Sequence, residues 1–352
     1  MNSIQLNLLP EDWSPLDETI QKIRELGSRH NNYVRFVRRV AASAMGQRPG
    51  SVILCAALSD FDAVEICGDI RLYIEESLKK YSNPSAGVCM VDTPHALRAR
   101  EMRGALVEAY HQAGDLFCAS HRSGPRFQLE GAPAYFGQNH AQRIATLIAH
   151  RDPAFYIFKN VHLLQRIDSQ PSDALEFVRM FAQIADTSGR THILLGDAHT
   201  VLGWMKTTEI ANSVTPLVLE PYDFNDDDDK AYFLSMLAGY DLDLPWQSGV
   251  KLADHGEYVH RIVGGSPHRV RKWVLNALCR ARALAQAELT WDCFTASQPS
   301  KSEVIQAGSE LTLVREFVGR PVKLPAPPSD QPKHNQSPGT RNLGRDPYAE
   351  SA

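Results

Sequence analysis

Five short runs of apolar residues are spaced along the first two thirds of the chain, and longer segments with helical periodicity separate them. Runs of this length with almost no polar positions are typical of strands that are buried on both faces of a parallel sheet. Strands that alternate with helices predict an α/β fold with right-handed crossovers. The predicted strands are 51–57, 86–91, 154–158, 192–195 and 214–219, and the predicted helices of this part are 15–42, 62–81, 97–113, 141–150 and 175–186.

The pattern changes after residue 225, where helical periodicity continues without further strands. The clearest helix covers 267–287, because its apolar residues recur at helical spacing over its whole length. The last 32 residues hold seven of the 21 prolines without apolar periodicity, which predicts a disordered tail. The predicted organisation is a helical segment (1–48), an α/β domain (49–225), a helical lid (226–296), a C-terminal extension (297–320) and the tail (321–352).

Composition limits the class of protein without identifying it. The chain has 352 residues, is 43% hydrophobic and carries a formal net charge of −4, so it can bury a large core and shows no global attraction to nucleic acid. No run of about 18 uncharged apolar residues occurs, and the first residues do not read as a secretory signal. We therefore expect a cytoplasmic protein without a membrane segment. Its six cysteines form no C-x-x-C pair, which predicts buried, reduced thiols without a metal.

The first predicted strand-to-helix turn is the place where a P-loop would bind phosphate. Such a loop reads G-x-x-x-x-G-K-[ST], with glycines that admit phosphate, a lysine that neutralises it and a hydroxyl that holds Mg²⁺. This chain has Ala56 and Phe61 at the glycine positions, Asp62 at the lysine and Ala63 at the hydroxyl. A carboxylate about 4 Å from polyphosphate would be unfavourable by several kcal/mol at an effective dielectric constant near 20.

The third predicted strand has the form of a Walker-B segment, in which an apolar run closes on D-E-x-H. Here Lys159 stands in place of the metal-binding acid and Asn160 in place of the acid that activates water. Because hydrolysis needs a ligand for the metal and a group that orients water, neither function is provided. These two motifs leave two interpretations open: a degenerate nucleotide-binding domain, or an unrelated α/β protein with strands in the same order.

Several later segments resemble one family in the right order. The residues Thr-His-Ile-Leu-Leu-Gly-Asp-Ala (191–198) resemble the fourth strand and sensor-1 segment of the TniB/TnsC-type AAA+ regulators of DNA transposition. Similar matches are Val-Asp-Thr-Pro (91–94), Pro-Tyr-Asp (221–223), Gly-Gly-Ser-Pro-His-Arg (264–269) and Leu-Thr-Trp-Asp-Cys-Phe (289–294). The resemblance covers about residues 50–295. It implies an AAA+ P-loop-type parallel sheet with a C-terminal helical lid.

The same resemblance implies a nucleotide site whose chemistry is lost. Family members bind ATP and assemble on DNA, but the replaced residues imply no catalytic residue, no Mg²⁺ and weak or absent ATP binding in this chain. Lys159 in place of Mg²⁺ could support metal-free binding, which Asp62 opposes. Asp197 stands at the sensor-1 position, where it accepts hydrogen bonds or serves as a turn residue. His268 and Arg269 stand where the lid places a sensor-2 arginine against the γ-phosphate; without phosphate, we expect helix capping and surface charge.

The resemblance further implies partners rather than a substrate. It points to a transposase or a target-selection protein, and to a homo-oligomer or a hetero-oligomer with an AAA+ partner. DNA contact is expected at a basic cluster at the start of the helix after the second strand, formed by Arg98, Arg100 and Arg103. Two other functions stay open: an active ATPase with unusual motifs, and an AAA-shaped interaction module unconnected with transposition.

Overall fold

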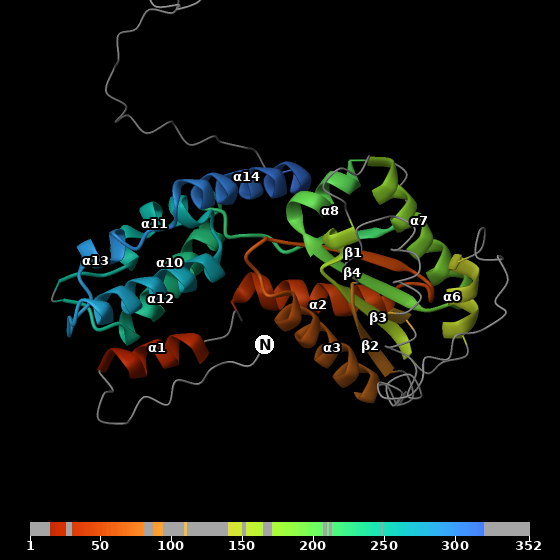
Figure 1. The fold of residues 1–352 in the computed structure, drawn as a ribbon, viewed down its shortest axis with the longest axis horizontal. Coiled ribbons are helices and arrows are strands. Elements are labelled where there is room, and N and C mark those ends of the chain that lie inside the picture. The colour runs from red at the N-terminus through yellow and green to blue at the C-terminus, as the bar shows by residue number, and fades with distance from the viewer. Residues whose placement is uncertain are drawn as a thin grey trace, which may run out of the picture.

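The computed structural model describes residues 15–25, 30–80, 87–93, 109–110, 140–149, 153–164, 171–206, 210, 213–247 and 249–319. The predicted helix 97–113, apart from residues 109–110, and the predicted tail lie outside these residues. Figure 1 shows an α/β part around a sheet on one side and a group of helices on the other, with the helix α14 (Lys301–Val318) lying along both. None of the helices in the described part of the chain combines the length and the apolarity needed to cross a lipid bilayer.

The sheet has five strands in the order β2-β3-β4-β1-β5, and all its described pairs are parallel. Each strand forms within a few residues of its predicted run, because the runs are apolar on both faces of the sheet. This order, followed by a helical lid, confirms the predicted AAA+ P-loop-type fold class. The strands are β1 (Val52–Ala57), β2 (Gly87–Asp92), β3 (Pro153–Lys159), β4 (Thr191–Asp197) and β5 (Thr215–Val218).

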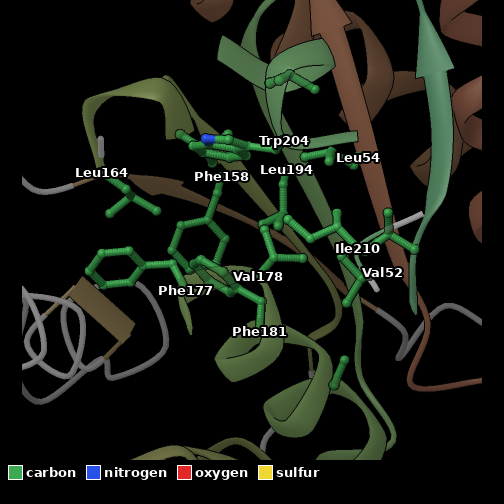
Figure 2. Close-up of a cluster of buried hydrophobic side chains, with 14 of the residues drawn as sticks. Val52, Leu54, Phe158, Leu164, Phe177, Val178, Phe181, Leu194, Trp204 and Ile210 are labelled. Carbon is green, nitrogen blue, oxygen red and sulfur yellow. The ribbon is translucent and has the colours of Figure 1, made fainter. Parts of the chain in front are cut away.

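Helices cover both faces of the sheet. Alternate residues of β1 enter different cores, since successive side chains of a strand point to opposite faces: Ile53 and Cys55 pack with α2 (Asn31–Gly46) and α3 (Ala63–Lys80). Figure 2 shows the other core, where Leu54 lies with Phe158, Val178 and Trp204. The helices of this second face are α6 (His140–Ala149), α7 (Pro171–Ser188) and α8 (Ala198–Met205).

The remaining helices form a third core. It contains the large side chains of Phe233, Trp273 and Phe294, and the ring centroids of Trp273 and Phe294 lie 4.3 Å apart in a stacked pair. The helix α1 (Pro15–Glu25) also packs here, and Arg282 pairs with Asp17 at 2.8 Å. The single helix predicted over 15–42 is therefore two helices, and they pack on different cores. The lid helices are α10 (Asp227–Asp243), η4 (Ala253–His255), α11 (Gly256–Val263), α12 (Pro267–Ala283) and α13 (Trp291–Thr295).

The long helix α14 was not predicted within the extension 297–320. It starts with a capping box between Ser300 and Glu303 and ends at Gly319, whose φ of +71° suits a left-handed cap. Its buried side carries two charged residues, Glu310 and Arg315, so it lacks a continuous apolar stripe. The helix contacts α8 of the α/β part and α11 of the lid. It therefore joins the two parts of the molecule.

The predicted burial of the cysteines is only partly correct. Cys55, Cys67, Cys89 and Cys293 are buried, but Cys279 is exposed on α12. Burial raises the pKa of the Cys67 thiol to about 12, which keeps this group protonated and inert at neutral pH.

One buried histidine lies in the aromatic core of the sheet. His192 is opposite Tyr156 in the β3–β4 register, and their rings stack with centroids 5.4 Å apart. Its Nδ1 atom lies 2.8 Å from the carbonyl oxygen of Arg190, to which it donates a hydrogen bond. Burial lowers the pKa of His192 to about 4, although this hydrogen bond acts in the opposite direction.

We predict that the protein loses stability as the pH falls from about 6.5 to about 4. The folded pKa of His192 lies below its unfolded value, so the fold favours the neutral ring, and this contribution is complete above pH 6.5. The loss from His192 alone is roughly 3 kcal/mol in the free energy of unfolding. Urea denaturation across this pH range measures it. His192→Asn should flatten the pH slope, whereas His199→Asn, on the exposed side of α8, should not. An NMR titration in which His192 protonates near pH 6.5 in the folded protein would contradict the prediction.

Candidate functional site

The carboxyl edge of the parallel sheet is where a ligand site is expected in this fold. The turn between β1 and α3, the ends of β3 and β4, and the start of α12 all contribute residues at this edge. The register places Ala57 opposite Asp197 and Asp92 opposite Lys159. The predicted site residues at the strand ends therefore lie along one edge of the sheet.

The turn at the P-loop position is short, and its own residue Asp62 caps the helix that follows. Ala56 is a fully buried residue of β1, and Ala63 already begins α3. Between them, Asp62 accepts a hydrogen bond from the backbone nitrogen of Val64 at 2.7 Å, so its carboxylate caps α3. A helix N-terminus binds an anion through free N–H groups. Here the carboxylate of Asp62 already occupies that position, so a phosphate would face a group of like charge.

Phe61 fills the space between this turn and the lid. Its ring lies 6.1 Å from His30, 6.3 Å from Tyr33 in a stacked pair and 5.8 Å from His268, measured between centroids. His30 in turn lies 5.4 Å from Tyr222, in the segment that leads into the lid. Burial, and to a smaller extent His268, lowers the pKa of His30 to about 3, so its ring is neutral. The rings form an uncharged aromatic contact across the junction between the sheet and the lid.

The end of β3 carries Lys159, the residue that the sequence analysis interprets as a replacement of the metal-binding acid. The Nζ atom of Lys159 lies 2.7 Å from the Oδ1 atom of Asp92 on the neighbouring strand. Asn160 has a φ of +61° and leads into the 3-10 helix η3 (Val161–Leu164), where its carbonyl accepts a hydrogen bond from Leu163. It therefore acts as a turn residue. Burial is the main cause of the raised pKa of the Cys67 thiol, and the charges of Lys159, Asp62 and Asp92 act on it to a smaller extent.

Asp197 caps a helix. Its Oδ1 atom accepts a hydrogen bond from the backbone nitrogen of Thr200 at 2.9 Å, at the start of α8. Its own backbone nitrogen donates to the Nδ1 atom of His162 at 3.3 Å. The predicted acceptance of hydrogen bonds at a strand end is thus present, and the donor is the protein backbone.

Arg269 lies in a buried ion cluster, so the expectation that it adds surface charge is wrong. Its Nη2 atom lies 2.6 Å from Glu310 Oε2 on α14 and 3.3 Å from Asp60 Oδ1 in the turn. The side chains of Arg269, Asp60 and Glu310 are 11%, 13% and 5% exposed. Ser266 caps α12 and donates a hydrogen bond to Asp60 Oδ2 at 2.7 Å. His268 packs on Phe61, and burial lowers its pKa although Asp60 acts in the opposite direction.

The helix α14 closes this cluster from outside the sheet. Gln306 donates a hydrogen bond to Ser59 Oγ at 3.0 Å, and the backbone nitrogen of Ser59 donates to Glu310 Oε2 at 3.4 Å. Sequence reasoning missed Asp60 and Glu310, because neither belongs to a recognised motif and their shared partner comes from a third segment. Nothing in the local sequence separates these two acids from exposed ones.

A second buried ion pair joins α14 to the segment that leads into the lid. Arg315 hydrogen-bonds to Asp223, which also accepts from the backbone and side chain of Asn225 at 2.9 and 3.0 Å. Burial alone would raise the pKa of Asp223, but these hydrogen bonds and the guanidinium hold it below its ordinary value. Beside this pair, a Cβ atom on Gly265 would lie 2.1 Å from the carbonyl oxygen of Tyr222, so the chain needs glycine there.

The residues at this edge do not fit a magnesium nucleotide. A carboxylate caps the helix that would hold the phosphates, an aromatic ring fills the junction below the lid, and the lid arginine is satisfied by protein carboxylates. Among the described residues, no group of three or more His, Cys, Asp or Glu side chains is arranged to hold a metal ion. The predicted DNA-contact residues Arg98, Arg100 and Arg103 lie outside the described residues.

We predict that Arg269→Met lowers the free energy of unfolding by roughly 3–5 kcal/mol, because it leaves two buried carboxylates without a cation. The triple variant with Asp60→Asn and Glu310→Gln should recover much of this loss, since it removes the charges as well. Lys272→Met on the same helix breaks an exposed pair with Glu303 and should cost at most about 1 kcal/mol. Urea denaturation of the four proteins tests the order. Equal losses for Arg269→Met and Lys272→Met would contradict a buried cluster.

Comparisons with known proteins do not identify a family. No family model matches the chain, and no curated protein matches it. It is similar to the structure of ORC2 from Aeropyrum pernix in ADPNP–ADP complexes (15% identity, TM-score 0.42, 83% of this chain and 69% of that chain). It is also similar to ORC2 in the ADP form (16%, 0.45, 82% and 70%) and to Drosophila ORC bound to DNA (11%, 0.49, 92% and 84%). The fold assignment itself rests on the strand order and the lid.

Proposed function

We propose that this chain is a catalytically degenerate AAA+ protein, which acts as an adaptor of a mobile element in target selection or transposase regulation. It works through contacts with protein and DNA and does not hydrolyse ATP. The observation that carries the proposal is the buried cluster of Arg269, Asp60 and Glu310. An arginine at the start of the lid is held against the turn by the protein's own carboxylates.

In this cluster, carboxylates of the protein pair with the lid arginine, so Arg269 needs no phosphate as a partner. A lid arginine that waits for a ligand must be left partly solvated, whereas Arg269 is 11% exposed and has two carboxylate partners. Bringing ATP to this place would set polyphosphate against the carboxylates of Asp60 and Asp62, which repel it, and against the pairing of Asp60 with Arg269. Binding would also require Phe61 to leave its contacts with His30 and His268. Each of these effects opposes the binding of ATP, and they act together.

The adaptor role follows from a lid that does not depend on a diffusible ligand. A ligand shifts a conformational equilibrium only by its differential affinity for the two states. With the lid already fixed, the proposed partners are a transposase or target-selection protein, DNA and further AAA+ subunits. The resemblance of residues 50–295 to transposition regulators supports this set of partners, and we propose that the protein acts in the cytoplasm.

We predict no measurable ATP binding tighter than about 1 mM and no hydrolysis above background. The test is calorimetric titration with ATP, once with Mg²⁺ and once with EDTA, together with a phosphate-release assay. The EDTA arm tests metal-free binding supported by Lys159, for which Lys159→Ala is the matched variant. Micromolar affinity in either arm, or turnover, would overturn the non-hydrolysing adaptor and favour an active ATPase.

The transposition part needs a separate test. Where a transposase is encoded beside this chain, we expect the two purified proteins to bind, with the same affinity in the presence and absence of ATP. Biolayer interferometry with both proteins measures this. A gene neighbourhood without a transposase, or a neighbouring transposase that does not bind, would reject the role in transposition. Either result would favour an interaction module unconnected with transposition.

A further inference from the structure

The outer side of α3 carries a short apolar strip that is centred on a glycine. Figure 1 shows this helix beside α2, at the border of the α/β part. Val64 and Leu72 are each 52% exposed, and Gly68 lies midway between them, four residues from each. Residues four apart on a helix are neighbours on one side, so the strip Val64–Gly68–Leu72 spans two turns, or about 12 Å. We call it the α3 strip.

The described fold gives no reason for a glycine at the centre of the strip. A Cβ atom added to Gly68 would meet no described atom within 4 Å, and the residue lies inside a helix. Glycine is unfavourable there relative to alanine, because it loses more backbone freedom on folding. What the glycine does provide is a notch between two exposed apolar side chains. A notch of this kind lets the backbone of a second helix approach closely.

This combination of a glycine and two exposed apolar side chains distinguishes α3 from the other described helices. Gly239 of α10 and Gly308 of α14 also have open space around an added Cβ atom. An exposed large apolar residue lies near each of them on one side only, Leu242 for Gly239 and Ile305 for Gly308. A contact between two copies of the same helix about its middle needs such a residue on both sides. Among the described helices, α3 meets this condition.

We propose that two copies of this chain associate through the α3 strip, with the helices antiparallel and the Gly68 residues at the twofold axis. An isologous contact of this kind requires a surface that is complementary to itself. Reversing the helix about Gly68 exchanges positions 64 and 72, so Leu72 meets Val64 of the second copy. It also exchanges positions 65 and 71, so Arg71 faces Glu65 of the second copy. A parallel pair would instead set Arg71 against Arg71, which repels.

The charges around the strip allow this arrangement. Arg71 pairs with Glu75 of its own helix at 2.7 Å in an exposed contact, which leaves it accessible to a second carboxylate. Glu65 acts on His268 of the lid, so the second copy would add a cation to an acid that is already positioned within its own chain. On the side of α3 that faces α2, Tyr33 donates a hydrogen bond to Asp69 at 2.9 Å.

The guanidinium of Arg38 lies 5.8 Å from the centre of the Tyr73 ring on that same side. These groups flank the strip and do not form part of it.

The size of the strip limits the strength of the contact. Two apolar side chains and one charged pair per copy cover far less than a standard interface of about 1,600 Å². The association is therefore weak, depends on concentration and stops at the dimer, because a twofold contact is closed. It rests on the proposed function only in that further subunits are among the partners proposed there.

The first test is sedimentation velocity of the full chain from about 5 to about 200 µM, a range suited to a weak contact. The wild-type protein should shift from monomer to dimer over this range. Leu72→Glu should weaken dimerisation at least about tenfold, because it places a charge in the apolar contact beside Glu65 of the second copy. Leu242→Glu is the matched control, since Leu242 is the most exposed of the large apolar residues at 88% and lies outside the strip. It should leave the dimer unchanged.

The second test separates the contact from the stability of the fold. Gly68→Gln should raise the melting temperature by about 1–2 °C, because glutamine favours a helix more than glycine does and its side chain has space. The same substitution should weaken dimerisation at least about threefold, because it fills the notch. Gly239→Gln on α10 should raise the melting temperature by a similar amount without changing dimerisation. A variant that fails to fold would lower the melting temperature instead, so the two effects are distinguishable.

Arg71→Ala tests the direction of the helices. In the antiparallel dimer it removes an attraction to Glu65 of the second copy, so the dimer should weaken about threefold and lose part of its dependence on salt. In a parallel dimer the same change removes a repulsion and would strengthen the association.

Five results would overturn the proposal. They are a monomer at every concentration, a dimer that survives Leu72→Glu, a dimer that Gly68→Gln leaves unchanged, a stronger dimer in Arg71→Ala, and assembly beyond the dimer that Leu72→Glu abolishes. None of these results bears on ATP binding. Conversely, ATP binding by the wild-type protein would overturn the non-hydrolysing adaptor while leaving this contact intact.

Discussion

The buried guanidinium of Arg269 is the constraint on which the arrangement of this molecule depends. A guanidinium cannot lose its charge, so its burial needs balancing carboxylates and acceptors for its hydrogen bonds, which here are Glu310 Oε2 and the carbonyl oxygen of Val263. Asp60 comes from the turn after β1 and Glu310 from the last described helix, so one cation fixes three distant segments. Removing the cation would leave two buried carboxylates, at a cost of roughly 3–5 kcal/mol, a large part of the stability of an ordinary protein.

The helix α14 turns this local contact into a link between the two parts of the protein. It approaches the lid through Glu310 and the segment before the lid through Arg315, while Val314 packs in the core of the sheet. Gly264 lets the backbone of α11 approach it closely, since a Cβ atom there would lie 2.7 Å from the carbonyl oxygen of Ala307. The lid is therefore positioned by contacts within the chain.

The sequence predicted the strands well and the charge cluster poorly, and the reason is physical. An apolar run such as that of β1 reports burial directly, because every one of its residues is buried. The buried face of α14 is charged at Glu310 and Arg315, so its pattern resembles that of an exposed segment. Motif spacing alone predicted Asp62 at the position of a P-loop lysine and Lys159 at the position of a Walker-B acid. The environment of Arg269 could not, because its partners lie 209 and 41 positions away in the chain.

A carboxylate of the chain and a diffusible phosphate can each pair with an arginine, but they differ in whether the pairing depends on a ligand. A phosphate leaves after hydrolysis or exchange, so an arginine that depends on it reports the state of the nucleotide. Asp60 and Glu310 stay at a fixed distance, and their effective concentration does not depend on any ligand. A ligand that must compete with them gains no differential affinity for a second lid position, and without such a difference it shifts no equilibrium. Under the proposed function, regulation of this protein therefore comes from the surfaces that meet other macromolecules.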